Sequence, residues 1–204
     1  MYIESSPRKQ RSASIEIARA FLEAYAQSHT GDRIETLDLW AEELPPFDGA
    51  TIDAKYAVLH GQEHSAEQAA AWQAVVTTFE RFNAADKYLF SVPMWNFGVP
   101  YKLKHYVDVI NQPGLTFSFS PEGGYKGLVT GKPAVVVYSR GGDYSQPGTE
   151  AMDLQKAYMD LWLKFIGFTD IHSILVEPMM QAPEAVAKTK SAAKEAAIKI
   201  AKTL

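Results

Sequence analysis

Apolar positions along the chain follow two patterns that alternate with each other. Residues 88–92 (YLFSV) and 133–139 (PAVVVYS) are nearly continuous apolar runs, which are typical of strands buried on both faces of a sheet. Three shorter strand candidates lie around Ile3, at residues 33–39 and at residues 171–176. Stretches with apolar residues spaced three or four apart separate these candidates, as in helices with one buried face. The alternation predicts an α/β fold, a doubly wound five-stranded parallel sheet with right-handed crossovers and helices on both faces.

Residue patterns at the ends of the helical stretches predict where helices begin. The first helix is expected to begin near Ser12, and Ser65 with Gln68 has capping-box spacing before a long helix. Three more helices are expected at residues 101–110, 151–166 and 183–204. Residues 45–64 are largely polar and give no clear assignment.

Residues 116–128 combine aromatic side chains with the pair Gly123 and Gly124. This combination predicts a hairpin or an extended excursion from the sheet. Such an excursion would either wall a pocket or pack against the domain or a second subunit.

The composition limits the kinds of protein that this chain can be. Its 204 residues suffice for one well-packed domain, so we expect residues 1–204 to form a single domain. No apolar run approaches the roughly 20 residues of a membrane helix, and a net charge of −4 argues against general binding to nucleic acid. The chain begins without the features of a signal peptide and has no cysteine, so the cytoplasm is the expected location. Without thiols, any redox chemistry must come from a bound cofactor.

Two histidines have a spacing that metal sites use. His60 and His64 lie four residues apart, which on a helix brings two imidazoles to one metal ion. Gly61 lies between them, and neither a third histidine nor a carboxylate-rich cluster is near in the sequence, so we interpret the pair as a surface coincidence and expect no metal.

The segment after the first strand candidate has the chemistry of a phosphate site. Residues 5–14 (SSPRKQRSAS) carry three cations and four serines without an acidic residue, in a chain that is acidic overall. Hydroxyl groups, the backbone N–H groups of a helix start and nearby cations all favour a phosphate. No glycine supports a Walker loop or a dinucleotide fingerprint here. The alternative is a solvated basic loop in which Ser12 is an ordinary helix cap.

The segment after the third strand candidate has the chemistry of a ring-binding site. Residues 93–100 (PMWNFGVP) place Met94, Trp95 and Phe97 around the single amide of Asn96. A flat apolar surface beside directed hydrogen-bonding groups suits a planar heteroaromatic ring, and the two prolines restrict the loop. The alternative is that these aromatic residues only cap the core.

A third segment follows the fourth strand candidate. Arg140, Gly141 and Gly142 come directly after Ser139, and glycine permits a close approach to the backbone. The alternative is a plain turn between strand and helix. In a parallel sheet the loops after strands one, three and four form one neighbourhood at the carboxyl ends. The chemistry of the three loops matches the three parts of FMN: its phosphate suits the first loop, the apolar side of its ring suits the second, and the polar edge of its ring suits the third.

Four segments together resemble a known family. SSPRKQRSAS, PMWNFGVPYKLKHYVD, GLTFSFSPEGGYKGLVTGK and SRGG occur in the order found in the FMN-dependent NADH:quinone oxidoreductases, also called azoreductases. The resemblance extends over nearly the whole chain and implies a flavodoxin-like fold. By the same resemblance, the first strand here begins later than in relatives, and we expect this to weaken the sheet that supports the phosphate loop.

The resemblance also implies the residues of the site. The positions that hold the FMN phosphate correspond to Ser6, Ser12, Ala13 and Ser14. The segment that lines the isoalloxazine ring corresponds to Met94, Trp95, Asn96 and Phe97, and the segment beside its pyrimidine end corresponds to Ser139, Arg140, Gly141 and Gly142. Variable positions that line the substrate pocket correspond to Phe119 and Tyr144.

For function, the resemblance implies two-electron reduction of quinones and aromatic azo compounds by NADH or NADPH. The flavin would carry hydride in a ping-pong sequence, so no protein side chain is expected to act as a nucleophile, and a homodimer is implied. The alternatives are a flavodoxin-type electron carrier without a small-molecule substrate, and a flavin-free interaction protein on the same fold.

Overall fold

The computed structural model describes residues 1–204 and contains a five-stranded parallel sheet in the order β2-β1-β3-β6-β7. Its strands are β1 (Tyr2–Glu4), β2 (Thr36–Asp38), β3 (Tyr88–Pro93), β6 (Ala134–Ser139) and β7 (Ile171–Val176). Counted along the chain, this order is 2-1-3-4-5, which is the order of the flavodoxin-like fold. The doubly wound parallel sheet predicted from the sequence is confirmed.

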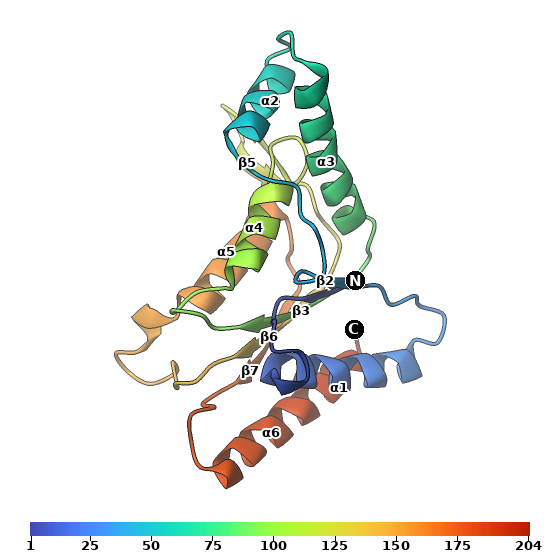
Figure 1. Cartoon of the computed structure of the whole chain (residues 1–204). Coiled ribbons are helices and arrows are strands. Elements are labelled where there is room, and N and C mark those ends of the chain that lie inside the picture. Colours follow the sequence, from blue (N-terminus) through green and yellow to red (C-terminus); the bar gives the residue numbers. More distant parts are fainter.

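Helices cover both faces of the sheet (Figure 1). On one face lie α1 (Ala13–Ser28) and α6 (Pro183–Ala201), which pack side by side over Leu89, Val135 and Val137. On the other face lie α3 (Ala66–Asn83), α4 (Tyr101–Ile110) and α5 (Leu154–Ile166), around a larger aromatic core. Each face therefore buries its own apolar layer, and the nearly continuous apolar runs of β3 and β6 lie between the two. None of the helices is long and apolar enough to cross a membrane.

Side-chain caps fix the starts of α1 and α3. Ser12 caps α1 by accepting a hydrogen bond from the backbone N–H of Ile15. Ser65 and Gln68 form the complete capping box, in which each side chain bonds the other residue's backbone N–H. Both predictions of helix starts are confirmed.

Three elements differ from the sequence prediction, and one of them is the last helix, which was predicted to residue 204 and ends at Ala201. The second strand spans three residues rather than 33–39, because its only neighbour in the sheet, β1, is itself three residues long. The helix predicted from residue 151 begins at Leu154, where Asp153 accepts a hydrogen bond from the N–H of Lys156; a short 3-10 turn precedes it.

A further helix, α2 (Gly49–Leu59), lies in the region that the sequence left unassigned. Asp48 caps it by accepting a hydrogen bond from the N–H of Thr51 at 3.1 Å. The apolar residues of α2 are spread around the helix instead of forming one face, so the periodic signal that marks the other helices is missing.

The aromatic excursion is a hairpin of β4 (Phe117–Ser120) and β5 (Gly124–Gly127). Its base packs on α5, since the rings of Phe117 and Tyr125 both lie against Phe165. A Cβ atom on Gly127 would come within 2.4 Å of the backbone at Ile166, so this contact requires glycine. The hairpin is thus anchored on its own domain, while Phe119 remains 61% exposed.

Candidate functional site

The loops after β1, β3 and β6 meet at the carboxyl edge of the sheet. The N–H of Ser5 donates to the carbonyl of Ser91 at 3.2 Å, and the N–H of Met94 donates to the carbonyl of Ser139 at 2.8 Å. Each loop therefore leaves the sheet beside the next one. The neighbourhood predicted from the sequence is confirmed, and it is the position at which ligands bind in sheets of this topology.

Three serines gather in the first of these loops and at the start of α1. Ser6, Ser12 and Ser14 are all buried, and the hydroxyl groups of Ser12 and Ser14 lie 3.1 Å apart. Ser6 Oγ accepts a 3.4 Å hydrogen bond from the N–H of Arg8. Hydroxyl groups, the N–H groups of the first turn of α1 and the positive end of its dipole all favour an anion here.

The cations of this loop divide into two kinds. Arg8 and Arg11 are exposed and have no carboxylate partner. Lys9, in contrast, forms ion pairs with Glu4 and Asp38. Only the two arginines are free to meet an incoming anion.

The aromatic loop is a tight turn. Trp95 and Gly98 exchange two backbone hydrogen bonds of 2.9 and 3.0 Å, and the two residues between them, Asn96 and Phe97, have φ values of 47° and 69°. Positive φ is uncommon outside glycine and costs a bulky residue about 1–3 kcal/mol. Such strain is concentrated at ligand sites, and here it presents Asn96, whose amide makes no hydrogen bond within the chain.

A groove of about 710 Å³ opens beside this turn. Trp95 and Asn96 border it on one side, and residues of α4 and of the segment before α2 border it on the other. These are Pro46, Phe47 and Asp48 before α2 and Tyr101, Lys104, His105 and Asp108 on α4; Val99, in the loop between the aromatic turn and α4, also lines the groove. Another cavity, of about 580 Å³, lies at the amino ends of the strands, around Met1 and Lys87. We assign the functional site to the carboxyl edge because the three loops with complementary chemistry meet there.

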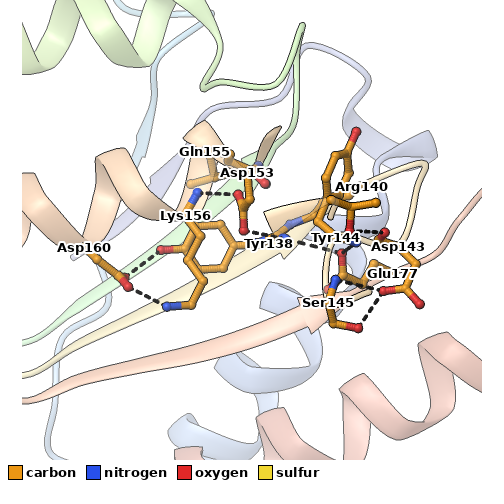
Figure 2. A network of polar contacts seen from close by, with 12 residues as sticks. Tyr138, Arg140, Asp143, Tyr144, Ser145, Asp153, Gln155, Lys156, Asp160 and Glu177 are labelled. Atoms are coloured by element: carbon orange, nitrogen blue, oxygen red, sulfur yellow. Dashed lines mark hydrogen bonds and ion pairs between the residues drawn. The ribbon is translucent and has the colours of Figure 1, made fainter. Parts of the chain in front are cut away.

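Arg140, at the start of the third loop, points into the protein (Figure 2). Its side chain is only 1% exposed, and Nη1 lies 2.8 Å from Oδ2 of Asp153 and 3.3 Å from Oε2 of Glu177. The same Glu177 oxygen accepts a hydrogen bond from the N–H of Tyr144. The guanidinium also lies over the rings of Tyr138 and Tyr144. The side chain of Arg140 thus organises the loop, and a ligand would meet this residue through its backbone.

The two glycines that follow Arg140 have different surroundings. A Cβ atom on Gly141 would lie 2.8 Å from Sδ of Met180, whose N–H donates to the Gly141 carbonyl at 3.0 Å. The atom that this Cβ would meet is the end of a flexible methionine side chain that is 85% exposed, so Met180 can move aside and position 141 does not require glycine. Gly142 is exposed, with the ring of Tyr144 beside it, so its backbone is open to a ligand.

Trp40, which sequence reasoning missed, connects two of the loops. Its Nε1 donates to the carbonyl of Ser5 at 2.9 Å, and its ring lies 5.8 Å from that of Trp95 and 5.4 Å from that of Tyr101. Trp40 comes two residues after the end of β2. The strand-end rule that pointed to the other loops would have pointed to this residue as well.

The predicted pocket residues have separate positions. Tyr144 packs beside Gly142 and Arg140, within the site. Phe119 contacts Tyr125 within the hairpin and makes no aromatic contact with Trp95 or Tyr144. A single chain therefore does not bring Phe119 together with the other predicted residues.

Comparisons with known proteins agree with this geometry. The chain matches, over residues 1–201, a family described as having a flavodoxin-like fold. A protein of Desulfotalea psychrophila named FMN-dependent NADH:quinone oxidoreductase is 49% identical over 204 residues, which cover 100% of this chain and 96% of that protein. A protein of the same name from Nitratidesulfovibrio vulgaris is 46% identical over 194 residues, covering 94% of this chain and 92% of that protein.

Solved structures show the same likeness. The crystal structure of an azoreductase from Bacillus anthracis has a TM-score of 0.92 and 29% identity, covering 100% of this chain and 98% of that chain. A FMN-dependent NADH-azoreductase from the same species, crystallised in complex with FMN, has a TM-score of 0.87 and 25% identity, covering 98% and 97% of the two chains.

Proposed function

The chain belongs to the flavodoxin-like family, and on this premise we propose that it is an FMN-dependent NADH:quinone oxidoreductase that also reduces aromatic azo compounds. The observation that carries the proposal is the meeting of a hydroxyl-rich loop, an aromatic turn and a glycine loop at one edge of the sheet. Relatives with this activity in their names match the chain along its whole length. Residues 1–204 act as one FMN-binding domain.

The residues of the site fit FMN. The buried hydroxyl groups of Ser6, Ser12 and Ser14, with the backbone N–H of Ala13, form a donor set for its phosphate. Met94, Trp95, Asn96 and Phe97 hold the ring system, and the free amide of Asn96 serves its polar edge. The backbone from Ser139 to Gly142 lies beside the pyrimidine end, with Arg140 fixing the shape of this segment from below.

The protein contributes position and electrostatics to the reaction. Bound FMN would supply two-electron chemistry between NADH and a quinone or an azo compound, in a sequence that we propose is ping-pong. The strained turn at Asn96 holds its amide in one orientation. Alignment of the nicotinamide against a fixed ring raises the effective concentration of the reactants, which can lower the activation barrier by about 7 kcal/mol or more. No side chain has to form a covalent bond.

A homodimer completes the site. The hairpin carries Phe119 and Tyr125 outward, with 61% and 66% of each side chain exposed, although both are large apolar groups. Leu154 and Leu161 on α5 are exposed as well. A second copy would cover these residues and bring Phe119 to a substrate pocket that a single chain leaves without it. Sedimentation velocity is expected to give a dimer, and a fully active monomer would contradict this.

The use of NADH as electron donor supports a cytoplasmic location, which we propose for this protein. The test of the proposed function is steady-state oxidation of NADH with a quinone as acceptor. Parallel double-reciprocal lines at several quinone concentrations support the ping-pong enzyme. Binding of FMN without oxidation of NADH would instead support an electron carrier.

A further inference from the structure

Lys9 occupies an unusual position in the middle of the hydroxyl-rich loop. Its φ is 49°, in the left-handed region that a side chain with a Cβ rarely adopts. Its Nζ lies 2.7 Å from Oε1 of Glu4 and 2.5 Å from Oδ2 of Asp38. The lysine therefore turns back toward the ends of β1 and β2 instead of pointing outward with Arg8 and Arg11.

The ion pair between Lys9 and Glu4 is important because Glu4 is buried close to Ser6. Glu4 is the last residue of β1, lies two positions before Ser6 and is only 8% exposed. The hydroxyl of Tyr2 is its other polar neighbour, at 3.4 Å from Oε2. Without a cation, a buried carboxylate at this place would repel a phosphate bound at Ser6 and would lose its solvation without compensation.

Asp38 ties the same lysine to the second strand. Its Oδ1 accepts a hydrogen bond from the N–H of Trp40 at 3.0 Å, which fixes the carboxylate at the end of β2. Partial burial by itself lowers the pKa of Lys9, but the hydrogen bonds to Asp38 and Glu4 outweigh it and raise the pKa, so the ammonium is charged at neutral pH. One cation thus faces two carboxylates beneath the loop.

We propose that Lys9 is a positioning residue for the flavin phosphate: it cancels the charge of the buried Glu4 and, held by Asp38, fixes the loop so that its donors receive the phosphate. This inference rests on the proposed FMN site. It gives the three cations of the loop different roles, since Arg8 and Arg11 are exposed without a carboxylate partner whereas Lys9 is paired with Glu4 and Asp38. The role is specific to the phosphate, because a flavin without one does not encounter the charge of Glu4.

The test compares FMN with riboflavin, which has the same ring and lacks the phosphate. Apoprotein of the wild type and of Lys9→Met is titrated with each flavin by fluorescence. We expect Lys9→Met to raise the FMN dissociation constant about tenfold and to change that of riboflavin less than about twofold. Lys9→Arg, which keeps the charge, is expected to stay near the wild type for both.

The double variant Glu4→Gln/Lys9→Met separates charge from loop structure. If Lys9 acts by cancelling Glu4, the double variant recovers most of the FMN affinity. Lys87→Met, which removes a lysine paired with Asp32 at the opposite edge of the sheet, is the matched control and should change neither flavin. Thermal unfolding of each apoprotein verifies that the variants fold.

The outcomes are distinct. An unchanged FMN constant in Lys9→Met, an equal loss for both flavins, or a double variant as weak as Lys9→Met would each overturn this inference while FMN still binds the wild type. Failure of the wild type to bind FMN would overturn the proposed function, and this inference with it.

Discussion

The indole Nε1 of Trp40 donates a hydrogen bond to the backbone carbonyl of Ser5 across 2.9 Å. The same ring packs against Trp95, so one side chain after β2 joins the phosphate loop to the aromatic turn. Because both loops are proposed to contact FMN, the geometry of one depends on the other through Trp40. This relationship leads to the first prediction.

Trp40→Phe is expected to keep most of the aromatic packing and to leave the Ser5 carbonyl without its partner. The loss of one such hydrogen bond lowers the free energy of unfolding by about 1 kcal/mol. Urea denaturation measures this, and flavin titration should show weaker binding of FMN. Trp72→Phe is the control, because the indole of Trp72 makes no hydrogen bond in the structure and the change should have little effect on FMN. Equal effects of the two substitutions would argue against a bridging role.

Substitutions at Asn96 can separate the amide from the backbone strain. Asn96→Ala removes the amide but keeps a Cβ at φ 47°, whereas Asn96→Gly removes the amide and relieves the strain. Both variants are expected to weaken FMN binding or slow flavin reduction. Because glycine relieves the strain, the free energy of unfolding in urea should be about 1 kcal/mol higher for Asn96→Gly than for Asn96→Ala. Wild-type values of FMN binding and reduction in both variants would remove Asn96 from the site.

Arg140→Met leaves Asp153 and Glu177 without their cation in a buried environment. Removing one partner of a buried ion pair lowers the free energy of unfolding by about 3–5 kcal/mol. Lys156→Met is the control, on the helix that Asp153 caps, since the Lys156–Asp160 pair is partly exposed and its loss should cost less than about 1 kcal/mol. Chemical denaturation of both variants measures the difference, and similar costs would contradict a central role for Arg140.

Glu16 braces α1 against α6 through ion pairs of 2.7 Å with Lys190 and Lys194. Burial by itself raises the pKa of Glu16, but the hydrogen bonds from the two lysines outweigh it, and the pKa lies below the usual value of 4.5. A lowered pKa in the folded state gives stability that is present above the unfolded pKa and is lost as the pH falls through the folded pKa.

Glu16→Gln should therefore cost up to about 1 kcal/mol of unfolding free energy at pH 7, and this cost should diminish as the pH falls below 4.5. Denaturation at pH 7 and at successively lower pH measures this, with Glu23→Gln as the control, because Glu23 is exposed on the same helix and has no ion pair. A cost for Glu16→Gln that persists at the lower pH would mean that it does not arise from charge.

The parts of the fold that the sequence predicts well are those with strong periodicity and clear ends. Helix α4 and strand β7 have the predicted boundaries, because proline and glycine flank one and a polar turn precedes the other. Helix α2 escapes prediction because its apolar residues form no single face. The strain at Asn96 could not be predicted from the sequence either, since it depends on a turn closed by Trp95 and Gly98.

For the site, the sequence indicates which residue types are present, but it does not indicate which way their side chains point. It groups Lys9 with Arg8 and Arg11, whereas the ends of two adjacent strands supply carboxylates that turn Lys9 inward. It likewise treats Arg140 as part of the ligand surface, whereas carboxylates distant in sequence bury its side chain. In both cases the deciding partner lies on another strand or helix, which a local pattern does not contain.

The most direct test of the central claim is the visible absorption spectrum of the purified protein, recorded without oxygen before and after addition of NADH and then of a quinone. We predict a yellow protein whose flavin absorption disappears with NADH and returns with the quinone. A colourless protein that takes up no FMN when it is supplied, or a yellow one whose spectrum NADH leaves unchanged, would contradict the account.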